Sequence, residues 1–139
     1  MAGTIHVDIV SPEGQLFAGD ANMVFAPASQ GEIGIAPRHA PLLTTLKAGE
    51  VRVQIEGQEE QSFYVGGGAL EIQPHLVSVL ADTAVRAHDL DEAAALAAKQ
   101  RAEEAVRGRT DKIDIAEATA ELARAMAQLR AIERLRKKR

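Results

Sequence analysis

The stretch VSVLADTAVRAHDLDEAAALAAKQ, residues 77–100, contains the change of pattern that decides the fold. Its first part alternates apolar and other side chains, as a strand with one buried face does. Its second part is rich in alanine, the residue that most favours helix. Asp89 and Glu92 stand three positions apart where this part begins, which is the spacing of a helix capping box. The sequence therefore predicts strands before Ala87 and helices after it.

The region before Ala87 has the pattern of a β domain. Residues 5–9 read IHVDI and residues 51–56 read VRVQIE, so apolar side chains fall on every second position. All five prolines, ten of the eleven glycines and all four aromatic residues lie in this region. Alternation with turn residues about every eight to twelve positions is typical of a sandwich. We predict an antiparallel β-sandwich over residues 1–87.

The region after Ala87 has the pattern of two helices. The first helix is predicted from the Asp89 cap to Gly108, a natural stop. The second is predicted to start at Asp114 as N-cap, and it places Ile115, Leu122 and Leu129 on one face. Because the link between the two is short and polar, we predict an antiparallel α-helical hairpin over residues 88–139.

The predicted hairpin has few large apolar side chains. In the first helix they are Leu90, Leu96 and Val106, and most of the remaining apolar residues are alanine. A buried Leu or Val contributes about 1.5–3 kcal/mol, and an alanine much less. We therefore expect helices that form readily and dock weakly, so that they can detach and act as a switch.

The sequence offers little for catalysis. It has no cysteine, its four histidines are not at metal-ligand spacing, and no phosphate-loop or dinucleotide motif is present. His39 lies between Pro37 and Pro41, in a loop that the prolines stiffen. An enzyme that uses His39 and Glu32 is one alternative, but it lacks a nucleophile, a metal and a cofactor motif. We expect no catalytic residue, no metal and no cofactor.

Charge is distributed unevenly along the chain. The formal net charge is -4, with -6 before His88 and +2 from His88 onward. The end of the chain, RAIERLRKKR (residues 130–139), is strongly basic. It could be a nucleic-acid or anionic-lipid patch, a solvated helix end that complements the helix dipole, or a surface for an acidic partner. No aromatic residue is interleaved for base stacking and the rest of the chain is acidic, so nucleic-acid binding has poor support.

The N-terminal sequence MAGTIHVDIV lacks the pattern of a signal peptide. The longest apolar runs are far shorter than a membrane span. We expect a soluble intracellular protein that associates with a membrane only through partners.

Four stretches resemble a known family. They are GEIGIAPRHAPLLTTLKAGEVRV (residues 31–53), VGGGALEIQP (65–74), VSVLADTAVRAHDLDEA (77–93) and AELARAMAQLRAIE (120–133). They occur in the order found in the epsilon subunits of bacterial F-type ATP synthases. The resemblance covers essentially the whole chain and agrees with the predicted plan of a β domain plus a helical hairpin.

The resemblance implies a non-catalytic rotor subunit of the proton-translocating enzyme, at the cytoplasmic face of the bacterial membrane. In this family the sandwich binds the gamma subunit and the membrane c-ring at the foot of the central stalk. The helices fold against the sandwich or extend into the alpha/beta catalytic head, where they restrain ATP hydrolysis. The partners implied are therefore gamma, the c-ring and the head.

The resemblance also implies contact residues. By position, they are Ser29 and Glu32 for the membrane ring, Ser11, His39 and Thr44 for gamma, and Arg124, Arg130 and Arg134 for the catalytic head. We further expect the basic end, Arg136 to Arg139, to strengthen the contact with the head.

Some members of the family bind ATP on the hairpin, and the resemblance to that site is incomplete. Asp91, Arg101 and Arg124 match its positions. Ala94 and Gln128, however, stand where arginines are found. Each lost charge-assisted hydrogen bond removes about 1.5–3 kcal/mol. We therefore predict weak or absent ATP binding.

Overall fold

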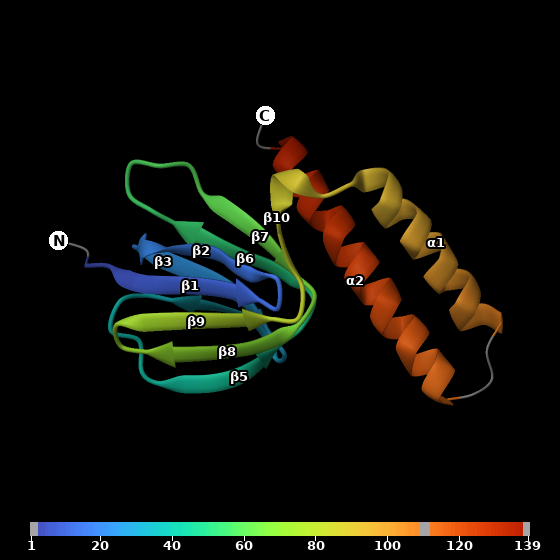
Figure 1. Cartoon of the computed structure of the whole chain (residues 1–139), viewed down its shortest axis with the longest axis horizontal. Coiled ribbons are helices and arrows are strands. Elements are labelled where there is room, and N and C mark those ends of the chain that lie inside the picture. The colour runs from blue at the N-terminus through green and yellow to red at the C-terminus, as the bar shows by residue number, and fades with distance from the viewer. Residues whose placement is uncertain (1–2, 109–111, 138–139) are drawn as a thin grey trace. The chain divides into compact units, whose positions relative to one another are not determined.

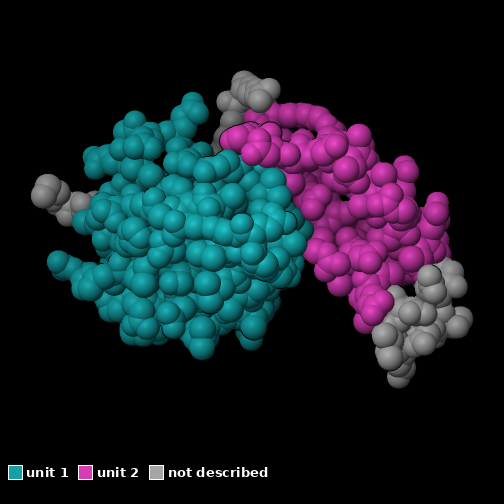
Figure 2. Space-filling view, in the orientation of Figure 1, with its two compact units in different colours: residues 1–86 teal, residues 87–139 magenta. Residues whose placement is uncertain are grey.

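The computed structural model describes residues 3–108 and 112–137 (Figure 1). It divides into two compact units, residues 1–86 and residues 87–139 (Figure 2). The first unit is built from strands and the second from helices. The predicted fold class, a β-sandwich followed by a helical hairpin, is confirmed.

The described part of the first unit contains ten strands. They are β1 (Ile5–Ser11), β2 (Gly14–Ala21), β3 (Met23–Ala28), β4 (Gly31–Ile35), β5 (Leu42–Leu46), β6 (Gly49–Gln54), β7 (Gln61–Val65), β8 (Gly68–Gln73), β9 (Leu76–Ala81) and β10 (Ala84–Arg86). Their order in the sheet is β10-β7-β6-β3-β5-β8-β9-β1-β2, and β4 pairs with β3. The pairs are antiparallel except β1 with β9, which run parallel. The sequence pattern did not predict this parallel pair.

The sheet folds back on itself, so that its two ends meet. Phe17 of β2 lies 5.6 Å from Phe63 of β7, between ring centroids. The guanidinium of Arg86, on β10, donates a hydrogen bond of 2.9 Å to the Leu16 carbonyl on β2. Alternate strand residues, Val7 among them, are fully buried between the two layers. This closed arrangement produces the sandwich core.

The glycine run at residues 66–68 marks a close approach between two strands. A Cβ on Gly68 would lie 2.1 Å from the Leu80 carbonyl oxygen, and Gly68 has φ 135°. Only glycine meets both conditions without strain. The sequence pattern indicates such a site, because isolated glycines inside strand patterns mark bulges or close backbone contacts.

The second unit contains a short 3₁₀ turn, η1 (Ala87–Asp89), and two helices, α1 (Glu92–Gly108) and α2 (Lys112–Lys137). An ion pair between Glu92, at the start of α1, and Arg136, near the end of α2, shows that the helices are antiparallel. Among the described helices, none combines the length and the apolar composition that crossing a bilayer requires.

The predicted starts of both helices need correction. The α1 cap is Asp91, because its carboxylate accepts a 3.2 Å hydrogen bond from the Ala94 amide. Asp89 lies in η1 instead, so the predicted capping box with Glu92 is wrong. The 3₁₀ turn shifts the start of the helix by two residues, to the next aspartate. The helix α2 begins at Lys112, before the predicted cap Asp114.

Candidate contact sites on the sandwich and the helical hairpin

The turn between β3 and β4 carries the two residues expected to face a membrane ring, Ser29 and Glu32. The Ser29 amide and hydroxyl each donate a 3.0 Å hydrogen bond to the Thr45 carbonyl on β5. The Ser29 hydroxyl also contacts the Thr45 hydroxyl. Gly31 supplies the positive φ, 132°, that closes the turn. The turn is therefore bound to a neighbouring strand at Ser29.

The carboxylate of Glu32 belongs to an ion-pair cluster. Arg52 Nη2 lies 3.1 Å from Glu32 Oε1, and Arg52 Nη1 lies 3.3 Å from Glu60 Oε2. Gln54 donates a 2.9 Å hydrogen bond to the same oxygen of Glu60. The Arg52 guanidinium also lies 4.3 Å from the Phe25 ring centroid. Sequence reasoning placed Glu32 at a contact surface but did not identify Arg52 as its partner.

The three residues expected to face gamma do not form one cluster. Ser11 ends β1, and its hydroxyl accepts a 3.3 Å hydrogen bond from the Glu13 amide. His39 lies in a loop tied to the β8–β9 turn, because the Arg38 amide donates a 2.9 Å hydrogen bond to the Pro74 carbonyl. In the same turn, the His75 carbonyl accepts a hydrogen bond from the amide of His6, near the start of β1. Ser11 and His39 are therefore at opposite ends of β1, a strand that spans about 20 Å at 3.3 Å per residue.

Thr44 has a different surrounding from its neighbours on β5. It pairs in register with Leu70, which is fully buried, so its half-buried side chain faces the core side of the sheet. The residues on either side of Thr44, Leu43 and Thr45, face outward.

An exposed apolar strip on the outer face of the β5-β8-β9 sheet was not identified from the sequence. Leu43 on β5 is 72% exposed and Leu80 on β9 is 52% exposed. On β8, Ala69 pairs with Leu80 on one side and with Thr45 on the other, so it lies diagonally from Leu43, whose own partner on β8 is Glu71. The signal was available: successive side chains of a strand face opposite ways, so in a sandwich, where each layer buries one face, only one of two adjacent leucines can face the core. We call Leu43, Ala69 and Leu80 the apolar strip.

The arginines expected to face a catalytic head all lie on α2. Arg130 is exposed, and Arg124 and Arg134 are half-buried. Arg130 and Arg134 are four residues apart and share one face of the helix, while Arg124 lies on another. Lys138 and Arg139, part of the predicted basic end, lie outside the described residues.

The three residues expected to hold ATP weakly do not contact a common group. Asp91 uses a carboxylate oxygen to cap α1, as described above. Arg101 is exposed and Arg124 is half-buried. No described hydrogen bond or ion pair joins these three side chains. The described residues also contain no cluster of three or more histidine, aspartate or glutamate side chains suited to a metal ion.

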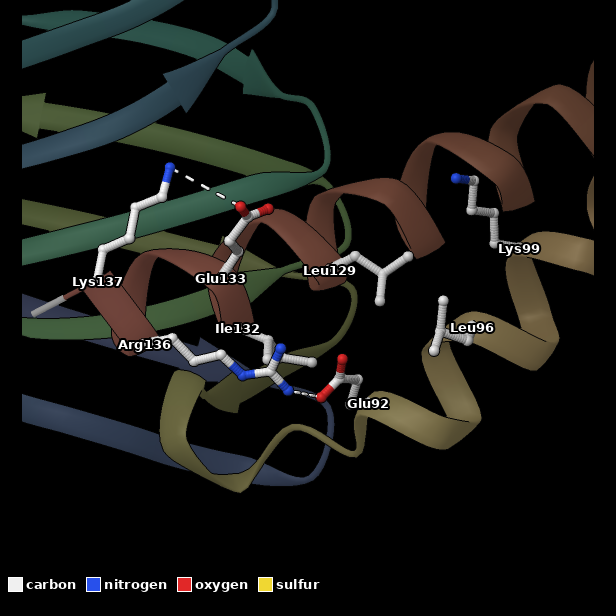
Figure 3. A pocket seen from close by; sticks show the side chains of 8 residues that line it. All are labelled: Glu92, Leu96, Lys99, Leu129, Ile132, Glu133, Arg136 and Lys137. Carbon is white, nitrogen blue, oxygen red and sulfur yellow. Dashed lines mark ion pairs between the residues drawn. The ribbon is translucent and has the colours of Figure 1, made fainter. Parts of the chain in front are cut away.

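An open groove of about 510 Å³ runs between α1 and α2 (Figure 3). Leu96, Leu129 and Ile132 form its apolar part. The ion pair of Arg136 with Glu92 crosses it from one helix to the other, as the dashed line in Figure 3 marks. None of the residues expected to hold ATP lines this groove.

Comparison with known proteins covers both units. The family model for the beta-sandwich domain of the ATP synthase Delta/Epsilon chain matches residues 4–87, and the model for its long alpha-helix domain matches residues 88–133. The ATP synthase epsilon chain of Nitrosococcus oceani is 65% identical over 138 residues, with 99% of each chain covered. That of Halorhodospira halophila is 63% identical over 136 residues, covering 97% of this chain and 96% of the relative.

Solved structures show the same fold at low sequence identity. A chain in the cryo-EM structure of the Euglena gracilis mitochondrial ATP synthase (OSCP/F1/c-ring) matches with TM-score 0.83 and 17% identity, covering 93% of this chain and 81% of that chain. A chain in the central stalk/c-ring structure of the Tetrahymena thermophila enzyme matches with TM-score 0.68 and 11% identity, covering 94% and 97%. With both family models and full-length relatives in agreement, the chain belongs to the Delta/Epsilon family of ATP synthase, as an epsilon chain.

Proposed function

We propose that this chain is a rotor subunit in the central stalk of a proton-translocating F-type ATP synthase. It couples rotation of the membrane c-ring to catalysis, and its helices restrain ATP hydrolysis. The chain is itself a non-catalytic subunit of the synthase. The observation that carries the proposal is the 65% identity to a bacterial epsilon chain over both units.

The sandwich, residues 1–87, binds gamma and the c-ring in this proposal. The turn with Ser29 and Glu32 meets the c-ring, and its hydrogen bonds to Thr45 support a fixed contact surface. Gamma covers the apolar strip, because an exposed Leu43 gains stability when a partner removes it from water. Ser11 borders this surface at the end of β1, and His39 meets gamma at the other end of that strand. Thr44 follows Leu43 on β5, but its side chain faces the core side of the sheet, so it would support the contact from beneath.

The helical hairpin, residues 88–139, is the regulatory part. In the extended form, Arg124, Arg130 and Arg134 meet an acidic segment of the alpha/beta catalytic head. Weak packing supports such a change, because the buried side chains of the described helices are all alanine: Ala95, Ala102, Ala118, Ala125, Ala127 and Ala131. A switch requires two arrangements that differ by only a few kcal/mol.

Other partners follow from the same proposal. The chain reaches the membrane only through the complex, as a peripheral subunit on the cytoplasmic face of the bacterial membrane, and it binds no nucleic acid. ATP binds weakly or not at all, because Ala94 offers no cation and the Asp91 carboxylate already caps α1.

The test is truncation after residue 87 in the assembled enzyme. The truncated chain should still assemble with gamma and the membrane enzyme, because the sandwich core is complete without the helices. ATP hydrolysis should rise, since the restraining helices are gone. Unchanged hydrolysis with normal assembly would exclude the inhibitory role, and loss of assembly would exclude the assignment of binding to the sandwich.

A further inference from the structure

We propose that Arg52 is a positioning residue that fixes the Glu32 carboxylate for its contact with the c-ring. The inference rests on the proposed contact at Glu32, and it adds the residue on which that contact depends. Arg52 lies on β6 and Glu32 on β4, with β3 between them in the sheet.

The guanidinium of Arg52 is held from the side of the sandwich. Its side chain is 16% exposed, lies over Phe25, and pairs with Glu60, which is 15% exposed. Gln54 holds the same Glu60 oxygen from a neighbouring position on β6. The position of the guanidinium is thus set by groups that are themselves largely buried.

Glu32 is the exposed member of the cluster. Its side chain is 53% exposed, and its described partner is Arg52 Nη2, at 3.1 Å from Oε1. Because Arg52 is anchored and Glu32 is not, the ion pair selects the rotamer of Glu32 rather than that of Arg52. Oε2 has no partner among the described contacts. It can therefore accept a hydrogen bond from a cationic or amide group on the ring.

The ion pair also adds a side-chain link between β4 and the rest of the sheet. The strand β4 pairs only with β3 in the described sheet, and Glu32 lies opposite Pro27. The Pro27 carbonyl accepts the Lys47 amide on the other side of β3, so Pro27 and Glu32 form a pair without backbone hydrogen bonds between them. The link from Glu32 to Arg52 therefore ties β4 to β6, with which it shares no backbone pairing.

A double-mutant cycle tests the proposal in the assembled enzyme. The variants are Arg52→Gln, Glu32→Gln and the two combined, and the readout is the binding constant of the F1 sector for stripped membrane vesicles. Each single change should weaken binding by roughly two- to five-fold, the scale of one exposed ion pair. The double variant should bind the vesicles as tightly as Glu32→Gln alone, because Arg52 acts through the Glu32 carboxylate and has no effect once that carboxylate is gone.

A purely structural role for Arg52 would give a different result. If the losses of binding in the two single variants add fully in the double variant, the positioning role is overturned. It is also overturned if Arg52→Gln binds normally while Glu32→Gln binds more weakly. No loss with Glu32→Gln would instead remove the ring contact at Glu32, and with it this inference. Arg86→Gln is the matched control, because Arg86 also stacks on a phenylalanine, Phe63, but does not reach Glu32.

A second measurement covers the case in which Arg52→Gln folds poorly. Glu60→Gln keeps Arg52 but weakens its anchor. NMR scalar couplings of the isolated full chain should report one dominant χ1 rotamer for Glu32 in the unmodified protein. In Glu60→Gln and in Arg52→Gln they should report averaging over several rotamers. An unchanged single rotamer in folded Glu60→Gln and Arg52→Gln chains would overturn the proposal.

Discussion

At the scale of single residues, His6 shows how an exposed group can acquire a fixed environment. Its Nδ1 lies 3.1 Å from Asp20 Oδ1 and its Nε2 lies 3.0 Å from Asp8 Oδ1. Only the protonated imidazole donates from both nitrogens at once. The hydrogen bond that the imidazole donates to Asp20 is the main cause that raises the pKa of His6 above 6.5; partial desolvation opposes this, and the hydrogen bond donated to Asp8 adds to the rise.

We predict that stability falls as pH rises through the pKa of His6. The pKa is raised in the folded state, so the stabilisation is complete below the unfolded value of 6.5 and is lost as pH passes the folded value. Denaturant unfolding from about pH 6 to about pH 8 should show this loss. The decrease should be smaller in Asp20→Asn, which removes the main partner. An equal decrease in Asp20→Asn would contradict the prediction, and solvent screening keeps the effect small because His6 is 44% exposed.

The same scale shows what the sequence could and could not indicate about the candidate sites. Glu32 was identified from its place in a recognisable loop. Its partner Arg52 is 20 residues away in sequence, and only strand pairing brings the two together. Local alternation, in contrast, indicates that one of the adjacent leucines Leu42 and Leu43 faces outward, although it does not say which. Contacts made through sheet register need the three-dimensional structure, because register is not encoded in any one stretch.

At the scale of elements, the hairpin combines an alanine interface with a charged connection at one end. None of the larger apolar side chains described on the helices is fully buried, and Leu96 and Met126 are 44% and 39% exposed. The sequence indicated a core of small side chains here, because few large apolar residues were present, and the buried helix residues are indeed alanines. It misplaced the α1 cap, since two aspartates stand two positions apart and local pattern cannot choose between them.

We predict that the pair of Glu92 and Arg136 helps to keep the hairpin closed. Glu92→Arg should separate the start of α1 from the end of α2, because it replaces an attraction with a repulsion. The double change Glu92→Arg with Arg136→Glu should restore the closed form. Spin labels at Ala97→Cys and Met126→Cys, in a chain with no cysteine of its own, would measure the separation.

The expected energy of this pair is small but relevant. An exposed pair contributes about 0.2–1 kcal/mol, which changes a population ratio by up to about five-fold. Added salt should therefore widen the measured distribution in the unmodified chain and have less effect in Glu92→Gln. Identical distributions in the unmodified chain and in Glu92→Arg would rule out a role for the pair.

At the scale of the whole molecule, the fold class follows from two periodicities and a change of composition near Ala87. The closed order of the strands does not follow from them. The parallel pairing of β1 with β9 joins segments about 70 residues apart, and alternation is the same for parallel and antiparallel neighbours. The pattern thus predicts two units, while the partners of each strand depend on how the core closes.

The last prediction concerns the two units together. If the helices switch between two arrangements, labels at Gln58→Cys on the sandwich and Ala123→Cys on α2 should give two distances in the assembled enzyme. Both side chains are exposed, so labelling should leave the core intact. A free-energy difference of about 1.4 kcal/mol gives a ten-to-one ratio of the two forms, which a distance distribution resolves.

Exchanging ADP for ATP should change this ratio, because a catalytic head whose conformation depends on the bound nucleotide binds the two forms with different affinity. Glu92→Gln should move the ratio toward the form in which the two helices have separated, with either nucleotide, because it removes the ion pair with Arg136. One distance under all conditions would contradict switching, and a ratio that changes without a change in hydrolysis would separate the movement from its regulatory role.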